Sequence, residues 1–426
     1  MTRPERADVA VIGGGSAGVA AAVAAARAGA RTVLVERGQR LGGNAAHALV
    51  HTICGLYHAA DEGEPVLAHA GLPAALARGL AASQGAAPPE RAGRVWYLPV
   101  RPDALSAAYA ELCRGAAGLE LRLGAELERA ELARTPSEDS LLRVRAAGAV
   151  SELAAGVVVD ASGDAAAAAL GGAATEQSPP EELQCPSYVF RLDGVDTSQL
   201  VGFARLKLGA ALAGGVRAGT LPPGADAIVV RASGRPGEVF ATLNLPRPAG
   251  EPWAPLDPEC LARMERGARA TAEAIASFLR DTRPAFARAR LAEHPGRLGV
   301  RETRRIAGSV RLSAEDVLAG RRRDDEVALS TWPIELWQDH RRPVFEQPAG
   351  ACSVPLGALV SRTHPRLGAA GRCLSATHEA LGALRVIGTA LATGEAIGAA
   401  AALAADRGKA LAEVAPSEVR SQIHGP

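Results

Sequence analysis

The chain begins with a hydrophobic pattern typical of a strand, a turn, a helix and a second strand. Val9–Ile12 is a short apolar run that ends in glycines, and residues 19–28 are alanine-rich without a helix breaker. Residues 31–36 return to strand character after a turn at Gly29. Short apolar runs are typical of buried strands, and alanine is the strongest helix former. The pattern predicts a strand–helix–strand unit near the N-terminus.

Similar patterns extend this unit into a larger domain. A helix is expected to begin at Pro102, because Leu105, Tyr109 and Leu112 recur at helical spacing. Residues 119–123 are expected to add a third parallel strand. Further strands are expected as an antiparallel pair at 127–132 and 141–144, and as a buried strand at 156–159. The apolar window 386–405 contains Glu395 and many small residues, which favours a buried helix over a membrane span.

The middle of the chain has a different pattern, with short strands separated by prolines. Strands are predicted at 187–192, 227–230 and 238–243, and helices at 200–218 and 257–281. We therefore expect an α/β protein in which residues 175–348 form an inserted α+β substrate or cap domain. The nucleotide-binding domain is then discontinuous, formed by residues 1–174 and 349–410, and residues 411–426 are expected to be a polar tail.

Composition excludes several classes of partner. The chain has 47 basic and 46 acidic residues, so its net charge of +1 gives no field to attract nucleic acid or an anionic membrane. Its six cysteines are scattered without CxxC spacing, so we predict no iron–sulfur cluster and no metal site. Scattered thiols in a long chain fit a reducing cytoplasm, where we expect the protein to reside.

A glycine motif carries the first chemistry. Gly13, Gly15 and Gly18 form GxGxxG between the first predicted strand and helix, with Ser16 and Ala17 inside the motif. Gly13 permits a tight turn, Gly15 lets the backbone approach a pyrophosphate, and Gly18 allows the helix to pack on the strand. Glu36 ends the second strand, where its carboxylate can accept ribose hydroxyls. This unit predicts dinucleotide binding without choosing between NAD and FAD.

Four further motifs carry a resemblance to a known family. Gly42-Gly43 follows the acid at position 36, residues 160–164 read DASGD after a strand, residues 299–306 read GVRETRRI, and residues 370–386 read AGRCLSATHEALGALRV. In this order they resemble the FAD-dependent oxidoreductase family, a distant relative of the succinate dehydrogenase and fumarate reductase flavoproteins. The resemblance implies a Rossmann-like FAD-binding domain of the two-dinucleotide-domain flavoprotein type. The residues that it places at FAD, with the glycine motif, are Gly13, Gly15, Ser16, Ala17, Gly18, Glu36, Arg37, Gly42, Gly43, Asn44, Leu127, Ala161, Gly163, Asp164, Gly371, Arg372, Arg385 and Val386.

Catalytic candidates come from the same motifs. His378 is either a proton donor beside the flavin ring or a structural hydrogen-bonding residue. His51 and His47 lie in a segment expected to run along the flavin, and we predict that neither bonds covalently to it. Arg301 and Arg304 could each bind an anionic substrate group or serve in structural ion pairs, and we favour Arg304 as the substrate ligand.

The expected function is hydride transfer between a small organic substrate and non-covalently bound FAD. The substrate is expected to be anionic, and an external electron donor or acceptor completes the reaction. The alternative is a flavin-bearing subunit that relays electrons within a larger redox complex. The sequence predicts neither the substrate nor the oligomeric state.

Overall fold

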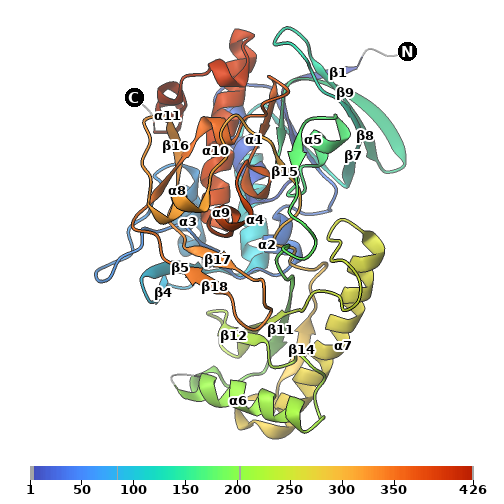
Figure 1. Cartoon of the computed structure of the whole chain (residues 1–426), viewed down its shortest axis with the longest axis vertical. Coiled ribbons are helices and arrows are strands. Elements are labelled where there is room, and N and C mark those ends of the chain that lie inside the picture. The colour runs from blue at the N-terminus through green and yellow to red at the C-terminus, as the bar shows by residue number, and fades with distance from the viewer. Residues whose placement is uncertain (1–3, 84, 201–202, 425–426) are drawn as a thin grey trace.

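The computed structural model describes residues 4–83, 85–200 and 203–424 (Figure 1). The predicted helix at 200–218 is seen as α6 (Phe203–Arg217), and residues 201 and 202 lie outside the described residues. The chain forms a larger domain around a parallel sheet and a smaller domain beneath it in the view of Figure 1. The α/β fold class is confirmed.

The central sheet has the order β6-β2-β1-β9-β8-β7, and β20 pairs with the carboxyl end of β9. The pairs β6–β2, β2–β1, β1–β9 and β9–β20 are parallel, whereas β7 and β8 form the predicted antiparallel pair. The seven strands are β1 (Glu5–Ile12), β2 (Thr32–Glu36), β6 (Leu119–Leu123), β7 (Ala125–Glu131), β8 (Ser140–Ala146), β9 (Ala149–Asp160) and β20 (Leu367–Ala369).

Two helices cross closely beside this sheet. They are α1 (Ser16–Arg27) and α10 (Ile387–Arg407), and almost every residue of both is buried. A Cβ on Gly394 would lie 2.1 Å from the carbonyl oxygen of Ala17, and one on Gly398 would lie 2.2 Å from that of Ala21. Only glycine allows this approach. Helix α10 is long and apolar enough to cross a membrane, but 89% of its most apolar window is buried inside the molecule, as predicted.

The remaining elements of the larger domain surround these helices. Helix α4 begins at Pro102 as predicted, and its Leu105 and Tyr109 are fully buried. A three-stranded sheet β3-β5-β4 lies on the side nearest the smaller domain. These elements are α2 (Gly43–His47), β3 (Thr52–Cys54), α3 (Leu72–Ala82), β4 (Glu90–Ala92), β5 (Val95–Pro99), α4 (Pro102–Arg114), α5 (Ala166–Leu170) and α9 (His378–Leu384).

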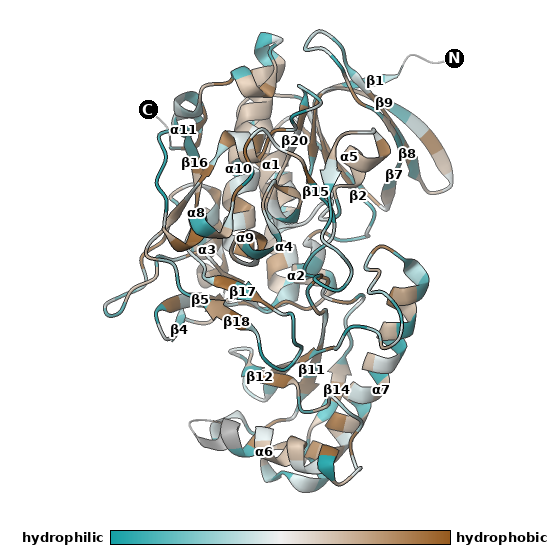
Figure 2. Cartoon of the chain, viewed as in Figure 1, coloured by the Kyte–Doolittle hydropathy of each residue, from teal (hydrophilic) through white to brown (hydrophobic). Residues whose placement is uncertain are grey.

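The smaller domain is an antiparallel sheet of order β12-β13-β11-β14. Helix α7 packs on it and carries alternating hydrophobic and hydrophilic patches (Figure 2). Its Ala272, Ile275 and Leu279 are buried at helical spacing. Asp257 caps α7 by accepting hydrogen bonds from the N–H groups of Glu259 and Cys260. These elements are β11 (Ser187–Asp193), β12 (Ile228–Ala232), β13 (Glu238–Asn244), α7 (Pro258–Thr282) and β14 (Arg290–Glu293).

The chain returns to the larger domain earlier than the predicted boundary at 348. Leu312, Val317 and Ile334 belong to the same buried core as α1 and α10, because short strands and a capped helix bring this segment back. These elements are β10 (Thr175–Glu176), β15 (Arg305–Ile306), α8 (Ala314–Leu318), β16 (Glu326–Ser330), β17 (Ile334–Leu336), β18 (Val344–Glu346) and β19 (Cys352–Pro355).

The end of the chain is not the expected polar tail. Helix α11 (Pro416–His424) packs against α10 and β16, and Leu411 and Val419 are completely buried. These two buried side chains attach the segment to the core although most of its residues are polar. The average composition of residues 411–426 does not reveal such single apolar positions.

Candidate functional site

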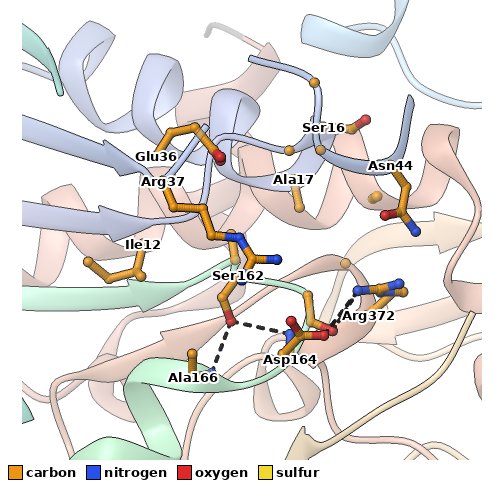
Figure 3. A pocket seen from close by; sticks show the side chains of 18 of the residues that line it. Ile12, Ser16, Ala17, Glu36, Arg37, Asn44, Ser162, Asp164, Ala166 and Arg372 are labelled. Carbon is orange, nitrogen blue, oxygen red and sulfur yellow. Dashed lines mark hydrogen bonds and ion pairs between the residues drawn. The ribbon is translucent and has the colours of Figure 1, made fainter. Parts of the chain in front are cut away.

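A cavity opens where the parallel strands β1, β2 and β9 end (Figure 3). It encloses about 1080 Å³ of empty space, part of it open to solvent. Ligands bind at this edge in open α/β sheets. The predicted cofactor residues that line it are Gly13, Gly15, Ser16, Ala17, Glu36, Arg37, Gly42, Gly43, Asn44, Leu127, Ala161, Gly163, Asp164, Gly371, Arg372 and Arg385.

Helix α1 points its N-terminus at this cavity. The capping residue is Gly15, which has no side chain to accept the first N–H groups, and the first turn contains no acidic residue. The hydroxyl of Tyr109 donates to Oγ of Ser16 at 2.8 Å and so fixes that side chain. An uncapped helix N-terminus presents free N–H donors and about half a positive charge, which together favour a phosphate group.

The glycine motif holds the backbone in this shape. Gly13 has φ +102°, and a Cβ there would lie 2.5 Å from the carbonyl oxygen of Ala161. A Cβ on Gly18 would lie only 1.7 Å from the carbonyl oxygen of Gly13, so Gly18 allows α1 to pack on the strand end. Gly18 is not among the residues that line the cavity. Its packing agrees with the role expected from the glycine motif, whereas its expected place among the residues at FAD is not matched by a position on the cavity wall.

Glu36 stands at the end of β2 with its side chain buried on the cavity wall. Its Oε2 accepts the main-chain N–H of Gly14 at 2.6 Å, and its Oε1 accepts that of Gly38 at 2.7 Å. These bonds fix the carboxylate, and a carboxylate oxygen retains further lone pairs for ribose hydroxyls. The position agrees with the ribose-binding role expected from the sequence.

Four arginines line the cavity: Arg37, Arg297, Arg372 and Arg385. Sequence reasoning missed Arg297, which reaches the Gly43 loop from a segment more than 250 positions away. Burial and repulsion by Arg372 and Arg37 lower its pKa to about 10, and its Nε is buried without a partner. A buried guanidinium with an unused donor favours an anionic ligand. In the sequence, the only indication that Arg297 belongs to the site was its position four residues before Arg301.

Arg372 and Asp164 face each other across one wall (Figure 3). The guanidinium of Arg372 lies 3.3 Å from Oδ1 of Asp164 and also donates to the carbonyl oxygens of Gly163 and Val300. Thr303 donates to Oδ1 of Asp164 at 3.0 Å. These contacts join the DASGD turn, the GVRETRRI motif and the C-terminal motif at one place.

Val386 does not line the cavity, in contrast to the prediction. It is buried in an apolar cluster with Val95, Tyr97 and Trp332. Its neighbour Arg385 does line the cavity and donates from Nη2 to the carbonyl oxygen of Glu335 at 3.1 Å. Nε of Arg385 is buried without a partner, and burial lowers the pKa of this guanidinium. Adjacent residues thus have opposite roles, one in the core and one at the site.

His378 lies in a buried polar network and not on the cavity wall. Its Nδ1 is 2.7 Å from Oε2 of Glu302, whose other oxygen accepts from Arg305 at 2.6 Å and Ser178 at 2.7 Å. Burial alone would raise the pKa of Glu302, but the hydrogen bond and charge of His378 and the charge of Arg305 lower it. Of the two expected roles, this geometry favours the structural one.

His51 is also buried away from the cavity-lining residues. Its ring stacks on Phe240 of β13 with a centroid distance of 4.9 Å and an interplanar angle of 12°. Burial and the nearby charge of Arg231 lower its pKa to about 3, so the ring is neutral near pH 7. Nδ1 lies 3.2 Å from the carbonyl oxygen of Leu49, and Nε2 has no partner. A buried, neutral His51 off the cavity wall does not fit the catalytic position beside the flavin that the sequence suggested.

The arginines of the GVRETRRI motif have separate environments. Arg301 stacks on Trp337 with its guanidinium carbon 4.6 Å from the ring centroid, and it donates to Oδ1 of Asn244 at 2.7 Å. Arg304 donates from Nε to the carbonyl oxygen of Asp164 at 3.1 Å. Neither lines the cavity, so the predicted direct contact of Arg304 with a ligand there is not seen.

An indole-bound carboxylate lies next to Arg385. The Nε1 groups of Trp332 and Trp337 donate to the two oxygens of Glu335 at 2.9 and 2.7 Å. The charge of Glu335 acts on Arg301, Arg385 and Cys54. The carboxylate of Glu335 and the guanidinium of Arg385 are therefore neighbouring opposite charges at the edge of the cavity.

Solved structures similar to this chain include monooxygenases and a reductase-like protein. They include p-nitrophenol 4-monooxygenase from Pseudomonas putida DLL-E4 (14% identity, 98% of this chain and 88% of that chain, TM-score 0.46). A probable FAD-dependent monooxygenase from Pseudomonas aeruginosa matches at 14% identity over 98% and 92% of the two chains (TM-score 0.47). A geranylgeranyl bacteriochlorophyll reductase-like protein from Thermoplasma acidophilum matches at 12% identity over 99% and 83% (TM-score 0.45).

No curated protein gives a significant sequence match. The sequence model of the family described as FAD dependent oxidoreductase matches residues 8–423, nearly the whole chain. With the glycine motif, the buried Glu36 and the cavity at the strand ends, this match establishes FAD as the cofactor and shows that the chain belongs to the FAD dependent oxidoreductase family.

Proposed function

We propose that the protein transfers a hydride between a small anionic organic substrate and FAD bound without a covalent link. The observation that carries the proposal is the uncapped N-terminus of α1 opening on a cavity that Glu36 and four arginines line. That donor set fits a dinucleotide with a pyrophosphate and an adenosine ribose. FAD supplies the redox chemistry, and the chain supplies binding, orientation and electrostatics.

Each group would then have a defined task. The free N–H groups of α1, Arg297 and Arg372 would bind the pyrophosphate, and Glu36 would accept the ribose hydroxyls. Gly15 and Gly43 lie so close that a Cβ on Gly43 would be 2.9 Å from Cα of Gly15. Because neither residue has a side chain, main-chain atoms would face the ligand here. His47 is not a lining residue, and its Nε2 is 3.1 Å from the carbonyl oxygen of Arg40, which supports non-covalent binding.

Arg385 is our candidate for binding the substrate anion. It lines the cavity, its Nε has no partner, and its only side-chain hydrogen bond among the described residues goes to a carbonyl oxygen. A planar guanidinium in that state binds a carboxylate strongly and in fixed orientation. Arg304 is already directed to the backbone of Asp164, so the expected anion site moves from Arg304 to Arg385.

The test is to purify the protein, precipitate it with acid and identify the released flavin by chromatography. FAD in the supernatant supports the proposal, and FMN or a flavin that stays in the pellet contradicts it. Anaerobic screening of small carboxylic acids should then find one that bleaches the bound flavin. If a partner protein reduces the flavin and no small molecule does, the electron-relay alternative replaces the enzyme proposal. The six free thiols support a reducing cytoplasm as the location.

A further inference from the structure

A second pocket lies between the two domains, and its residues have no part in the proposed FAD site. It encloses about 400 Å³, part of it open to solvent. The larger domain contributes the loop that follows β2 and the start of α4, and the smaller domain contributes strands β11, β13 and β14. Small-molecule sites are common at such domain boundaries, with volumes of roughly 300–1,000 Å³. Leu49 and Phe240 give the pocket an apolar portion.

Most charges around this pocket are already paired. Arg191 forms ion pairs with Asp193 at 2.5 Å, Glu238 at 2.9 Å and Glu293 at 3.2 Å. Arg101 pairs with Asp103 at 2.5 Å. Arg101 and Asp103 neutralise each other, whereas Arg191 sets one positive charge against three carboxylates; together these ion pairs give the pocket a fixed shape. The remaining charged groups therefore determine which kind of ligand the pocket could bind.

Two exposed guanidinium groups are outside these ion pairs, although the charge of Arg235 also acts on the Asp103 carboxylate. Arg40 and Arg235 both line the pocket, and neither forms an ion pair within the part of the chain that the structure describes. Arg40 comes from the larger domain and donates to the carbonyl oxygen of Ala46 at 3.0 Å. Arg235 comes from the turn between β12 and β13. Two such cations from different domains favour an anion that both can contact.

The pocket also contains an unused acceptor. Glu238 is only 7% exposed and lines the pocket, and its Oε1 has no hydrogen-bond partner although its Oε2 accepts from Arg191. A buried carboxylate oxygen without a donor is costly, so a donor is expected there. An anion alone does not satisfy this oxygen, because phosphate and carboxylate groups repel it. The pocket requires an anionic group and a hydroxyl or amine in one molecule.

We infer that this pocket binds a phosphorylated sugar, with its phosphate on Arg40 and Arg235 and a sugar hydroxyl on Oε1 of Glu238. The phosphate accepts several hydrogen bonds from two guanidinium groups, and the sugar supplies the donor that Glu238 lacks. A free sugar phosphate and the phosphoribose part of a pyridine nucleotide share this chemistry. Phe240 of this pocket also stacks on His51, in the segment that follows the Gly42-Gly43 turn.

The first experiment is calorimetric titration of the FAD-loaded protein, in which FAD occupies the larger cavity. The probes are ribose 5-phosphate, ribose and inorganic phosphate. Ribose 5-phosphate should bind at one site and at least about tenfold more tightly than either part. Arg235→Gln should weaken it by about 10- to 100-fold, the effect of losing a charge-assisted bond. Arg217→Gln, at the exposed end of α6, is the matched control and should leave the affinity unchanged.

Glu238→Gln separates recognition of the sugar from general structural damage. It should weaken ribose 5-phosphate but not inorganic phosphate, so the ratio of the two affinities should fall. A loss of stability alone would not change this ratio. The inference is overturned if ribose 5-phosphate binds no better than inorganic phosphate, or if Arg235→Gln behaves like Arg217→Gln.

A second experiment identifies the source of the phosphoribose. Only this experiment rests on the proposed function. If NADPH reduces the flavin through this pocket, ribose 5-phosphate should compete with it and Arg235→Gln should slow anaerobic bleaching. If ribose 5-phosphate binds but NADPH does not, the ligand is a free sugar phosphate. Binding by neither molecule contradicts the inference, even when FAD is present and the proposed function holds.

Discussion

The main-chain N–H of Gly14 lies 2.6 Å from Oε2 of Glu36 and donates a hydrogen bond to it. This bond connects the glycine turn after β1 to the end of β2, so one carboxylate both shapes the turn and faces the cavity. The finding explains why an acid at the end of the second strand belongs to the same motif as glycines some twenty positions earlier. In the proposed FAD site, Glu36 would therefore serve both the local fold and cofactor binding.

Glu36→Gln should therefore weaken FAD binding. The amide keeps the size of the carboxylate but loses the charge-assisted bonds to ribose hydroxyls, which predicts a loss of about 10- to 100-fold in affinity. The measurement is the dissociation constant of FAD with apoprotein, followed by flavin fluorescence. Glu126→Gln is the matched control, because Glu126 also lines the cavity but is exposed and forms no side-chain hydrogen bond or ion pair with the described residues. Equal affinities for both variants would remove Glu36 from the site.

The crossing of α1 and α10 gives a prediction about stability. Gly394→Ala places a Cβ 2.1 Å from the carbonyl oxygen of Ala17, so the helices must separate, and overpacking of this kind costs about 1–3 kcal/mol. Gly267→Ala in α7 is the control, because a Cβ there meets nothing within 4 Å. In a helix interior that change should stabilise by about 0.5–1 kcal/mol. Urea unfolding of both variants should give effects of opposite sign.

Local chemistry made much of this fold predictable from the sequence. The strand–GxGxxG–helix unit, the strand at Leu119–Leu123 and the long apolar helix each follow from patterns within a dozen or two residues. The Ala-rich composition of α1 and α10 also agrees with their close approach. About half of the cavity-lining residues belong to the glycine motif, the Gly42-Gly43 pair, the DASGD turn and the C-terminal motif, so the site could be outlined before its geometry was known.

What could not be predicted depends on contacts between distant segments. Arg297 is a site residue only because its segment meets the loop at Gly43, and no local pattern records that meeting. Residues 305–348 return to the larger domain because β16 pairs with β19, and short strands do not show which partner they will find. His378 was chosen from its motif and His51 from its place in the segment expected along the flavin, whereas contacts with Glu302 and Phe240 from distant segments hold both away from the cavity wall.

Glu395 should make stability depend on pH. It is 7% exposed, it accepts the N–H of Leu72 at 2.8 Å at the start of α3, and burial raises its pKa to about 7 from 4.5. The folded state holds this proton more tightly than the unfolded state. The contribution of Glu395 to the free energy of unfolding is therefore largest below pH 4.5 and is lost as the pH rises to about 7. The loss from this group is roughly 3 kcal/mol at most.

Glu395→Gln keeps the acceptor for Leu72 and removes the titration. The variant should be more stable than wild type at pH 8, and the difference should shrink toward pH 5. Urea unfolding at several pH values measures it. A constant difference between the two proteins across this range would show that Glu395 does not titrate as stated.

The last prediction compares Arg385 with Arg304, which the sequence favoured as the substrate ligand. Arg385 lines the cavity with an unpaired Nε, whereas Arg304 uses its Nε on the carbonyl oxygen of Asp164 and does not line it. Arg385→Lys keeps the charge but loses the planar fork, so substrate-dependent flavin reduction should fall by about 10- to 100-fold through a higher KM. Arg304→Lys should change it less than about threefold. Stopped-flow reduction of FAD-loaded protein under anaerobic conditions measures both, with flavin content and unfolding midpoint as checks on folding. If Arg304→Lys is the more damaging change while FAD content stays normal, the substrate anion binds at Arg304 and the original sequence prediction is restored.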